Sequence, residues 1–325
     1  MAEPLLAVNN LQMHLFSNRG ERVVKAVDGV SFTLSKGETM GIVGESGSGK
    51  TMTSLSILRL LPTAGRIVGG EIRFAGEDLL GKSDQEMQRI RGSDIAMILQ
   101  DPMMSLNPLF TIGEQIAEPL RVHRGMRGAG LFNRLKELLN GVRIPSPEAR
   151  LRDYPHQMSG GMRQRIVGAI GISCEPSLLI ADEPTTSLDV TIQAQYLRLL
   201  KDIQQRVGLA MMFITHDIGI VAKMCDYVAV MYAGKLVERA PMRTLFREPK
   251  HPYTEALLKA VPRLNTSADR LWSIEGQPPD LSAIPPGCPF SPRCPVAEER
   301  CRHETPPEFC LGPNHYARCW LRETA

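Results

Sequence analysis

The 325-residue sequence lacks both the long apolar run of a membrane span and a strong charge of one sign. No apolar stretch approaches the roughly 18 residues that cross a bilayer. The first residues, Met1 to Pro4, lack the basic-then-apolar pattern of a secretory signal. The formal net charge is only +3, which is too small to predict a nucleic-acid surface. We therefore expect a soluble intracellular protein, which could still reach a membrane by docking to a partner.

Sustained heptads, internal repeats and the short C-x2-C knuckles of common zinc folds are also missing. The first two absences argue against a long coiled coil and a repeat array. The sequence instead has 43% hydrophobic and 22% charged residues, an ordinary globular composition. Its length suits one large core or two domains.

One segment carries a phosphate-binding pattern. Residues 44–51 read GESGSGKT and fit the P-loop pattern G-x-x-x-x-G-K-[ST], and the run 39–43 before them is typical of a buried strand. Glycines let consecutive backbone N–H groups wrap around phosphates, and the helix expected near Lys50 adds the positive end of its dipole. Lys50 is expected to reach the β- and γ-phosphates, and the Thr51 hydroxyl to ligate Mg²⁺. The expected nucleotide-binding residues here are Gly44, Glu45, Ser46, Gly47, Ser48, Gly49, Lys50 and Thr51.

A second candidate element follows the apolar run 178–181. Asp182 ends this expected strand, where a carboxylate can hold Mg²⁺ directly or through water. Glu183 follows at a position from which it can polarise an attacking water. An Asp-Glu pair after a strand is also a common solvated turn, so this segment alone leaves both interpretations open.

Secondary-structure patterns divide the chain into successive stretches. Residues 5–99 alternate short strand-like runs with turns, with a helix expected over 54–61. Residues 101–157 are mostly helical in pattern, and 160–236 alternate again, which predicts a sheet with crossover helices. Proline and cysteine accumulate over 276–313, which suits an irregular, metal-stapled appendage.

The segment 158–165, MSGGMRQR, resembles the signature motif LSGGQ-x-QR of ATP-binding cassette (ABC) proteins. Met replaces the usual Leu at its first position and the usual Gln at its fifth. Ser-Gly-Gly opening a helix makes an anion-binding N-terminus. In that family the motif faces the P-loop of a second cassette. The resemblance implies that Ser159, Gly160 and Gly161 contact the γ-phosphate of ATP held by a partner.

The remaining elements of the family follow in order. Gln100 matches the Q-loop glutamine that touches Mg²⁺, and residues 186–189 resemble the D-loop that contacts the facing cassette. His216 matches the switch histidine that contacts the γ-phosphate. Phe16 is the candidate for the aromatic that stacks on adenine, although a phenylalanine in a strand region is more often part of a core.

The resemblance also implies roles in hydrolysis. Glu183 and His216 are the expected catalytic residues, which position the water that attacks the γ-phosphate in line. Lys50 and the Ser159 region of the facing cassette are expected to stabilise charge. The implied Mg²⁺ ligands are Thr51, Gln100 and Asp182.

The resemblance to ABC proteins implies an α/β fold of the P-loop NTPase class. We expect a mixed sheet core, an antiparallel β region and a helical subdomain over about 101–157. The nucleotide-binding domain is expected over 1–250. A small, irregular, metal-binding extension of the oligopeptide-transporter type is expected over 251–325.

Several segments are similar to those of dipeptide and oligopeptide importers, most of all their D-type ATPase subunit. They are residues 100–108, 154–157, 181–186, 189–195 and 251–254. The resemblance implies an ATPase that energises peptide import at the cytoplasmic face of the inner membrane. The implied partners are a paralogous ATPase subunit in a heterodimer, two transmembrane permeases and an extracytoplasmic substrate-binding protein. Residues 101–157 would receive the coupling helices of the permeases.

Two other functions stay open as alternatives. A soluble ABC ATPase acting on a ribosome or DNA shares these motifs, but such proteins normally carry two cassettes or a long coiled coil. An ATP-switched redox or metal sensor rests on the cysteines alone. Among importers, dipeptides, longer peptides, glutathione-like compounds and metal chelates all stay open as substrates.

Five of the seven cysteines fall between residues 288 and 319, which in a reducing compartment favours metal over disulfides. Four thiolates suit a [4Fe–4S] cluster and Zn²⁺ equally. In the importers that this chain resembles, four C-terminal cysteines at similar spacing bind a four-iron cluster. Cys310 and Cys319 compete for the place of fourth ligand, and the tail 314–319 resembles the family's final ligand segment. The implied ligands are Cys288, Cys294, Cys301 and Cys319.

Overall fold

The structure is a computed structural model that describes residues 3–17, 22–101, 105–186, 188–261 and 273–323. It divides into two compact units, residues 1–81 with 213–325 and residues 82–212. The boundary predicted at residue 250 lies inside the first unit and stays a prediction. Ser187 of the expected D-loop, and Pro102, Met103 and Met104 of the importer-like segment, lie outside the described residues.

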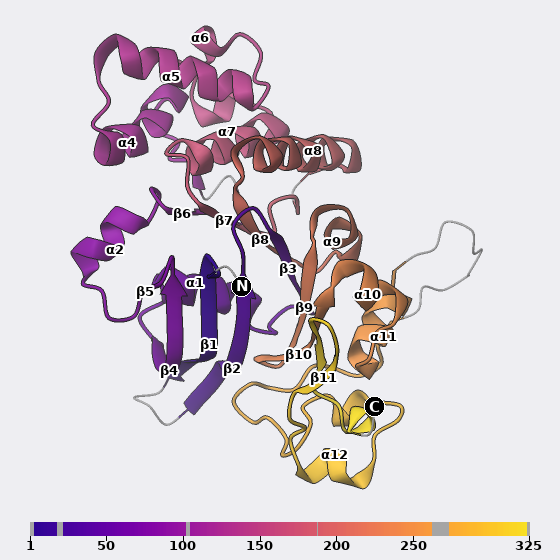
Figure 1. Cartoon of the computed structure of the whole chain (residues 1–325). Helices are drawn as coiled ribbons and strands as arrows, with labels where there is room; N and C mark the ends of the chain where they lie inside the picture. The colour runs from indigo at the N-terminus through magenta and orange to yellow at the C-terminus, as the bar shows by residue number, and fades with distance from the viewer. Residues whose placement is uncertain (1–2, 18–21, 102–104, 187, 262–272, 324–325) are drawn as a thin grey trace. The chain divides into compact units, whose positions relative to one another are not determined.

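An antiparallel sheet with the strand order β2-β1-β4-β5 forms one part of the first unit (Figure 1). β1 (Leu6–Ser17) pairs with β2 (Arg22–Leu34) on one side and with β4 (Gly65–Phe74) on the other. The short β5 (Glu77–Asp78) completes the edge. This sheet matches the antiparallel β region expected of an ABC cassette.

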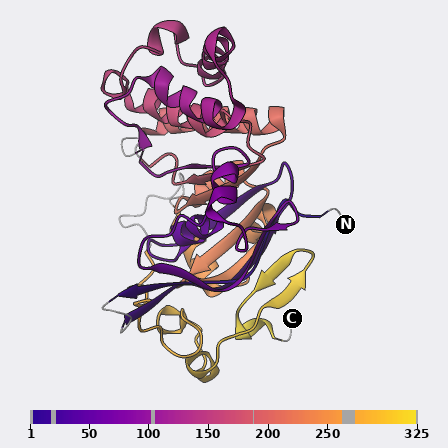
Figure 2. The ribbon, with the colours of Figure 1, turned by 90° about the vertical axis from the view of Figure 1, so that its left-hand side faces the viewer.

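The other sheet strands of the first unit mix parallel and antiparallel pairs. β3 (Thr39–Val43) runs parallel to β9 (Tyr227–Tyr232), which pairs antiparallel with β10 (Lys235–Pro241). All five residues of β3 are buried, as the continuous apolar run predicts. The hairpin of β11 (Phe309–Gly312) and β12 (His315–Ala317) then pairs with β10, so the C-terminal segment extends the sheet edge (Figure 2).

Short helices complete the first unit. α1 begins at Lys50 as predicted but ends at Ile57 rather than at residue 61, because Arg59 takes a positive φ of 51° and Pro62 follows. The other helices are α9 (Ile218–Met224), α10 (Met242–Arg247), α11 (Pro252–Lys259), α12 (Glu299–His303) and the 3₁₀ turns Ser291–Arg293 and Trp320–Arg322.

The second unit holds two parallel strands and most of the long helices. β6 (Ile95–Ile98) pairs with β7 (Leu178–Asp182), and β8 (Ala210–Thr215) begins in this unit and ends in the first. β7 and β8 are wholly buried, as their apolar sequences predict. The helices are α2 (Asp84–Ile90), α4 (Ile112–Arg124), α5 (Gly128–Gly141), α6 (Pro147–Arg150), α7 (Gly160–Ile172) and α8 (Val190–Val207), with a 3₁₀ turn at Pro155–Gln157.

The described part of the region 101–157 is mostly helical, as its sequence predicts. Thr111 and Glu114 form a reciprocal capping box that starts α4, and Gly125 ends it in a left-handed conformation at φ 62°. The buried face of α4 repeats at helical spacing, with Ile112, Ile116 and Leu120 all inside. No helix of the described chain is long and apolar enough to cross a membrane.

Candidate nucleotide-binding site

The P-loop joins β3 to α1 in the strand–loop–helix arrangement that its motif requires. Gly49 precedes α1 at φ 105°, and a Cβ at this position would collide with the carbonyl oxygen of Ala26. The first turn of α1 carries no acidic side chain. The positive end of the helix dipole is therefore not neutralised by its own side chains, which suits a phosphate.

Lys50 is buried, with only 6% of its surface exposed, and points back into the loop. Its Nζ donates hydrogen bonds to the carbonyl oxygens of Gly44 at 2.8 Å and Glu45 at 2.9 Å. The hydroxyl of Ser48 lies 3.5 Å from the same nitrogen. Phosphate oxygens carry more charge than carbonyl oxygens and accept such bonds more strongly. The ammonium is thus already placed within the loop, where a phosphate can replace its carbonyl partners. Thr51 is exposed one residue further on.

In the second unit, Gln100 lies beside Glu183. β6 and β7 are parallel neighbours, so the residues beyond their carboxyl ends emerge at one edge. The Nε2 atom of Gln100 donates a hydrogen bond of 3.0 Å to Oε2 of Glu183, and the Thr186 hydroxyl donates another of 3.0 Å. Asp182 is buried at the end of β7, 3% exposed. Glu183 takes φ 45°, a strained value of the kind that collects at functional sites.

The Ser-Gly-Gly segment starts α7. Ser159 caps this helix, because its Oγ accepts a hydrogen bond of 3.3 Å from the backbone N–H of Met162. Ser159 and Gly160 are exposed. The hollow beside them is also lined by two cationic residues, Arg143 and Arg165. The sequence analysis did not single out these arginines, although Arg165 is the last residue of the MSGGMRQR segment.

Two predicted site residues of the first unit lie at strand ends. His216 is exposed directly after β8. Asp217, which follows it, caps α9 by accepting hydrogen bonds from the N–H groups of Gly219 and Ile220. Phe16 is half-buried near the end of β1, with its ring centroid 6.3 Å from that of His14.

A contact that the sequence analysis missed holds the second residue of the P-loop. The Glu45 carboxylate pairs with both terminal nitrogens of Arg293, at 2.7 and 3.0 Å. The Glu45 backbone N–H donates to the Tyr253 hydroxyl at 3.0 Å. The partners lie 208 and 248 residues from Glu45 in the chain, so no local pattern points to them.

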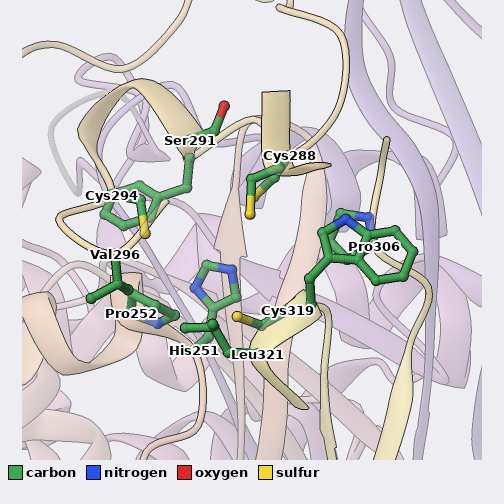
Figure 3. A pocket seen from close by; sticks show the side chains of 12 residues that line it. His251, Pro252, Cys288, Ser291, Cys294, Val296, Pro306, Cys319 and Leu321 are labelled. Atoms are coloured by element: carbon green, nitrogen blue, oxygen red, sulfur yellow. The ribbon is translucent and has the colours of Figure 1, made fainter. Parts of the chain in front are cut away.

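Four of the five clustered cysteines line one pocket. Figure 3 shows the sulfur atoms of Cys288, Cys294 and Cys319 pointing into this space, and Cys301 also lines it. Cys310 is exposed on β11 and does not line the pocket. Within the described residues, no three or more His, Cys, Asp or Glu side chains lie close enough together to hold a metal ion.

The groups around this pocket have shifted pKa values. The pKa of the Cys288 thiol is raised to about 11, chiefly by burial; a hydrogen bond from the Phe290 backbone opposes this shift and the neighbouring cysteines add to it. Burial also raises the pKa values of Cys294 and Cys319. Burial lowers the pKa of His251 to about 4, and its Nδ1 accepts a 3.0 Å hydrogen bond from the Tyr253 N–H. That nitrogen is therefore already occupied in capping α11.

A P-loop between a buried strand and a helix, an acid pair after a second buried strand and a serine-capped Ser-Gly-Gly helix together define the nucleotide-binding cassette of ABC proteins. The pattern of the ABC transporter family matches residues 27–186, and the pattern of the oligopeptide/dipeptide transporter C-terminal region matches residues 237–301.

Individual proteins are similar in sequence to this chain over almost its whole length. The dipeptide transport ATP-binding protein DppD of Bacillus subtilis (strain 168) is 49% identical over 99% of this chain and 96% of its own length. The probable peptide ABC transporter ATP-binding protein y4tR of Sinorhizobium fredii is 50% identical over 98% and 95%. The solved dimeric post-hydrolysis structure of the ATP-binding cassette MJ0796, bound to ADP and Pi, is similar with a TM-score of 0.65 and 26% identity. It covers 73% of this chain and 99% of that chain. The chain belongs to the ABC transporter family and is a transport-coupled ATPase of the kind that uses ATP and Mg²⁺.

Proposed function

We propose that this chain is the ATP-hydrolysing subunit that energises the import of peptides, of the dipeptide or oligopeptide class, through a membrane ABC transporter. The observation that carries the proposal is the near-complete match to proteins named for dipeptide and peptide transport, together with the match to the C-terminal region of such transporters. A soluble ABC ATPase acting on a ribosome or DNA is not favoured by these relatives.

The residues of the nucleotide site divide into those that bind and those that act on water. In the first unit, Lys50 and the N–H groups of residues 44–51 bind the phosphates, Phe16 stacks on adenine and His216 contacts the γ-phosphate. In the second unit, Glu183 positions the attacking water and accepts its proton. Its contact with Gln100 supports this role, because the amide holds one carboxylate oxygen in place.

Magnesium ion fits the donors present. Asp182 is a buried carboxylate at a strand end, and the Thr51 hydroxyl and the Gln100 amide oxygen are the kind of hard ligands that Mg²⁺ takes. When bound with ATP, Mg²⁺ offsets the negative charge of the phosphates. We assign Thr51, Gln100 and Asp182 as the residues that hold it.

Two surfaces of the second unit suit partner proteins. The exposed Ser159 and Gly160 at the start of α7 suit the γ-phosphate of ATP held by a second cassette, as the dimeric relative suggests. A separate hollow on α4 is lined by Phe110, Glu118 and Val122, and the exposed Leu109 lies next to Phe110 in the chain. We propose this hollow as the seat of the permeases' coupling helices.

We assign the four pocket cysteines to a [4Fe–4S] cluster, with Zn²⁺ as the alternative. A single Zn²⁺ needs its four sulfurs within about 2.3 Å of one point. In a cluster, each cysteine binds a different iron, so its sulfurs stand further apart. The resemblance to importers whose C-terminal cysteines bind a four-iron cluster favours the second arrangement, and the shared pocket supplies four thiols for it. We assign Cys288, Cys294, Cys301 and Cys319 as ligands, since Cys310 lies outside the pocket.

The proposal places the chain at the cytoplasmic face of the inner membrane. Its partners there are a paralogous ATPase subunit, two permeases and an extracytoplasmic substrate-binding protein. Affinity purification of the tagged chain from detergent-solubilised membranes, followed by mass spectrometry, tests this directly. Recovery with two polytopic permeases and a second cassette ATPase supports the importer. Recovery alone, or with ribosomes or DNA, would move the assignment to a soluble ABC machine.

A further inference from the structure

Arg293 and Glu45 form an ion pair between the C-terminal segment and the phosphate-binding loop. Both terminal nitrogens of Arg293 contact the Glu45 carboxylate, at 2.7 and 3.0 Å. The Arg293 side chain is only 5% exposed, whereas that of Glu45 is 28% exposed. A bidentate contact between an arginine and a carboxylate fixes the orientation of the two side chains in addition to pairing their charges.

The arginine is itself held on several sides. Its Nε donates to the carbonyl oxygen of Glu275 at 2.9 Å, and its Nη1 donates to the Tyr232 hydroxyl at 3.3 Å. The Glu45 carboxylate raises the pKa of Arg293 further above its usual value. A guanidinium with this many partners is preorganised before any nucleotide arrives.

The other polar groups of Glu45 are engaged as well. Its backbone N–H donates to the Tyr253 hydroxyl, and its carbonyl oxygen accepts from Lys50. Together with the carboxylate contact to Arg293, Glu45 thus makes three such contacts. Two of them involve residues beyond 250, namely Tyr253 and Arg293. The P-loop is therefore held from outside by the C-terminal part of the chain.

An acidic side chain in this position needs neutralising. A triphosphate bound by residues 44–51 would meet the Glu45 carboxylate as a like charge, which costs binding free energy unless a cation offsets it. Without Arg293, that carboxylate could also draw Lys50 away from the phosphates. By pairing with the Glu45 carboxylate, Arg293 reduces both its repulsion of the triphosphate and its attraction for Lys50.

We propose that Arg293 is a positioning residue for nucleotide binding: it pairs with Glu45, neutralises the acidic member of the P-loop and fixes the loop from the C-terminal segment. The proposal rests on the assignment of residues 44–51 as the ATP site. It gives the C-terminal segment a direct influence on ATP affinity. Cys294, which lines the cysteine pocket, is the next residue in the chain.

The experiment compares Kd for Mg²⁺–ATP, by equilibrium binding to the purified full chain, among the wild type and five variants. Arg293→Ala leaves a partly buried carboxylate without its cation. Such a loss falls between the cost of an exposed and of a fully buried pair, so we expect Kd to rise about 10-fold. The rise is expected to shrink at high salt, where charges are screened. The double variant Glu45→Gln with Arg293→Ala is expected to return Kd to within about 2-fold of the wild type, because the unpaired charge is gone.

Arg239→Ala is the matched control. Arg239 pairs with Glu308 at 2.8 and 3.1 Å and stacks on the ring of Tyr316 at 3.8 Å, so it too fastens the C-terminal segment, but it has no contact with residues 44–51 among its described interactions. We expect this variant to leave Kd unchanged. An equal rise in Kd for Arg239→Ala, or no recovery in the double variant, would overturn the proposal in favour of a purely structural role.

Glu45→Gln alone keeps the test decisive if Arg293→Ala does not fold. The proposal expects it to bind ATP at least as tightly as the wild type, because a negative charge has been removed; clearly weaker binding would overturn it. Lys50→Ala separates this inference from the site assignment. If Lys50→Ala binds ATP normally, the P-loop assignment itself fails, whereas a loss of binding there with an unchanged Arg293→Ala overturns only the role of Arg293.

Discussion

Gln100 donates a 3.0 Å hydrogen bond to the carboxylate of Glu183, so a residue proposed to hold Mg²⁺ contacts the residue proposed to act on water. The two lie 83 residues apart and come from neighbouring parallel strands. The Thr186 hydroxyl binds the same carboxylate oxygen. The orientation of Glu183 is thus set by two donors before nucleotide binds.

Glu183→Gln is expected to keep ATP binding intact and to slow hydrolysis at least ~100-fold, the usual scale for the loss of a general base. The amide has nearly the same shape but accepts a proton poorly. Phosphate release under saturating ATP measures the rate, and equilibrium binding measures Kd. Glu175→Gln is the control, because Glu175 is an exposed acid that pairs with Arg134 in the same unit. Turnover of Glu183→Gln equal to that of this control would contradict the assignment.

The sequence could predict those parts of the site that depend on local chain geometry. The P-loop, the start of α1 at Lys50 and the serine cap of α7 each follow from residues within one turn of one another. Both Gln100 and Glu183 follow strands with apolar sequences, but that these two strands pair in parallel, and so bring the two residues together, is known only from the structure.

Other features depend on contacts or backbone conformations that no sequence pattern encodes. The pairing of Glu45 with Arg293 joins residues 248 positions apart, and the bound state of Lys50 inside its own loop depends on local carbonyl directions. The early end of α1 depends on the left-handed conformation of Arg59, a residue type that favours helices. Tertiary context decides the first of these, and local backbone conformation rather than residue propensity decides the other two.

Val122→Asp is expected to weaken the association with permeases at least ~10-fold while leaving ATP binding unchanged. Val122 is 70% exposed on α4 and lines the hollow that we assign to the coupling helices, and a carboxylate buried in such an interface is costly. The yield of permeases in affinity purification of the tagged variant measures the effect.

Val207→Asp is the control for this surface. Val207 is 53% exposed at the end of α8 and does not line that hollow. We expect normal recovery of permeases with this variant. Similar losses for both valines would show that any added charge on the unit disturbs assembly, and would remove the support for the hollow.

Cys319→Ser is expected to abolish the bound cluster, whereas Cys310→Ser keeps it. Cys319 lines the pocket with Cys288, Cys294 and Cys301, and Cys310 is exposed outside it. Iron and acid-labile sulfide in anaerobically purified protein, with its brown colour, measure occupancy. Loss of the cluster in Cys310→Ser, with its retention in Cys319→Ser, would make Cys310 rather than Cys319 the fourth ligand. If the wild-type protein is colourless and contains stoichiometric Zn²⁺, the pocket binds zinc and not a cluster.

The stability of the C-terminal part is expected to fall between pH 6.5 and about 4, through His251. Burial lowers the pKa of this imidazole to about 4 from an ordinary value of 6.5, Glu238 acting against the shift and Arg322 with it. Below pH 6.5 the unfolded chain takes up a proton that the folded chain refuses. The contribution of His251 to the free energy of unfolding is therefore fully present above pH 6.5. It is lost as pH falls, and the loss reaches about 3 kcal/mol at about pH 4.

His251→Asn tests the origin of this pH dependence, because asparagine can also cap α11 by accepting from the Tyr253 N–H but does not titrate. Urea unfolding followed by tryptophan fluorescence suits the measurement, since the Trp320 indole lies at the same pocket and donates to the carbonyl of Glu304 at 2.9 Å. We expect His251→Asn to flatten the decline between pH 6.5 and 4, and His303→Asn, a change at an exposed histidine, to leave it intact. If the wild type and His251→Asn lose stability in parallel, the acid sensitivity comes from other groups, and the buried imidazole only caps the helix.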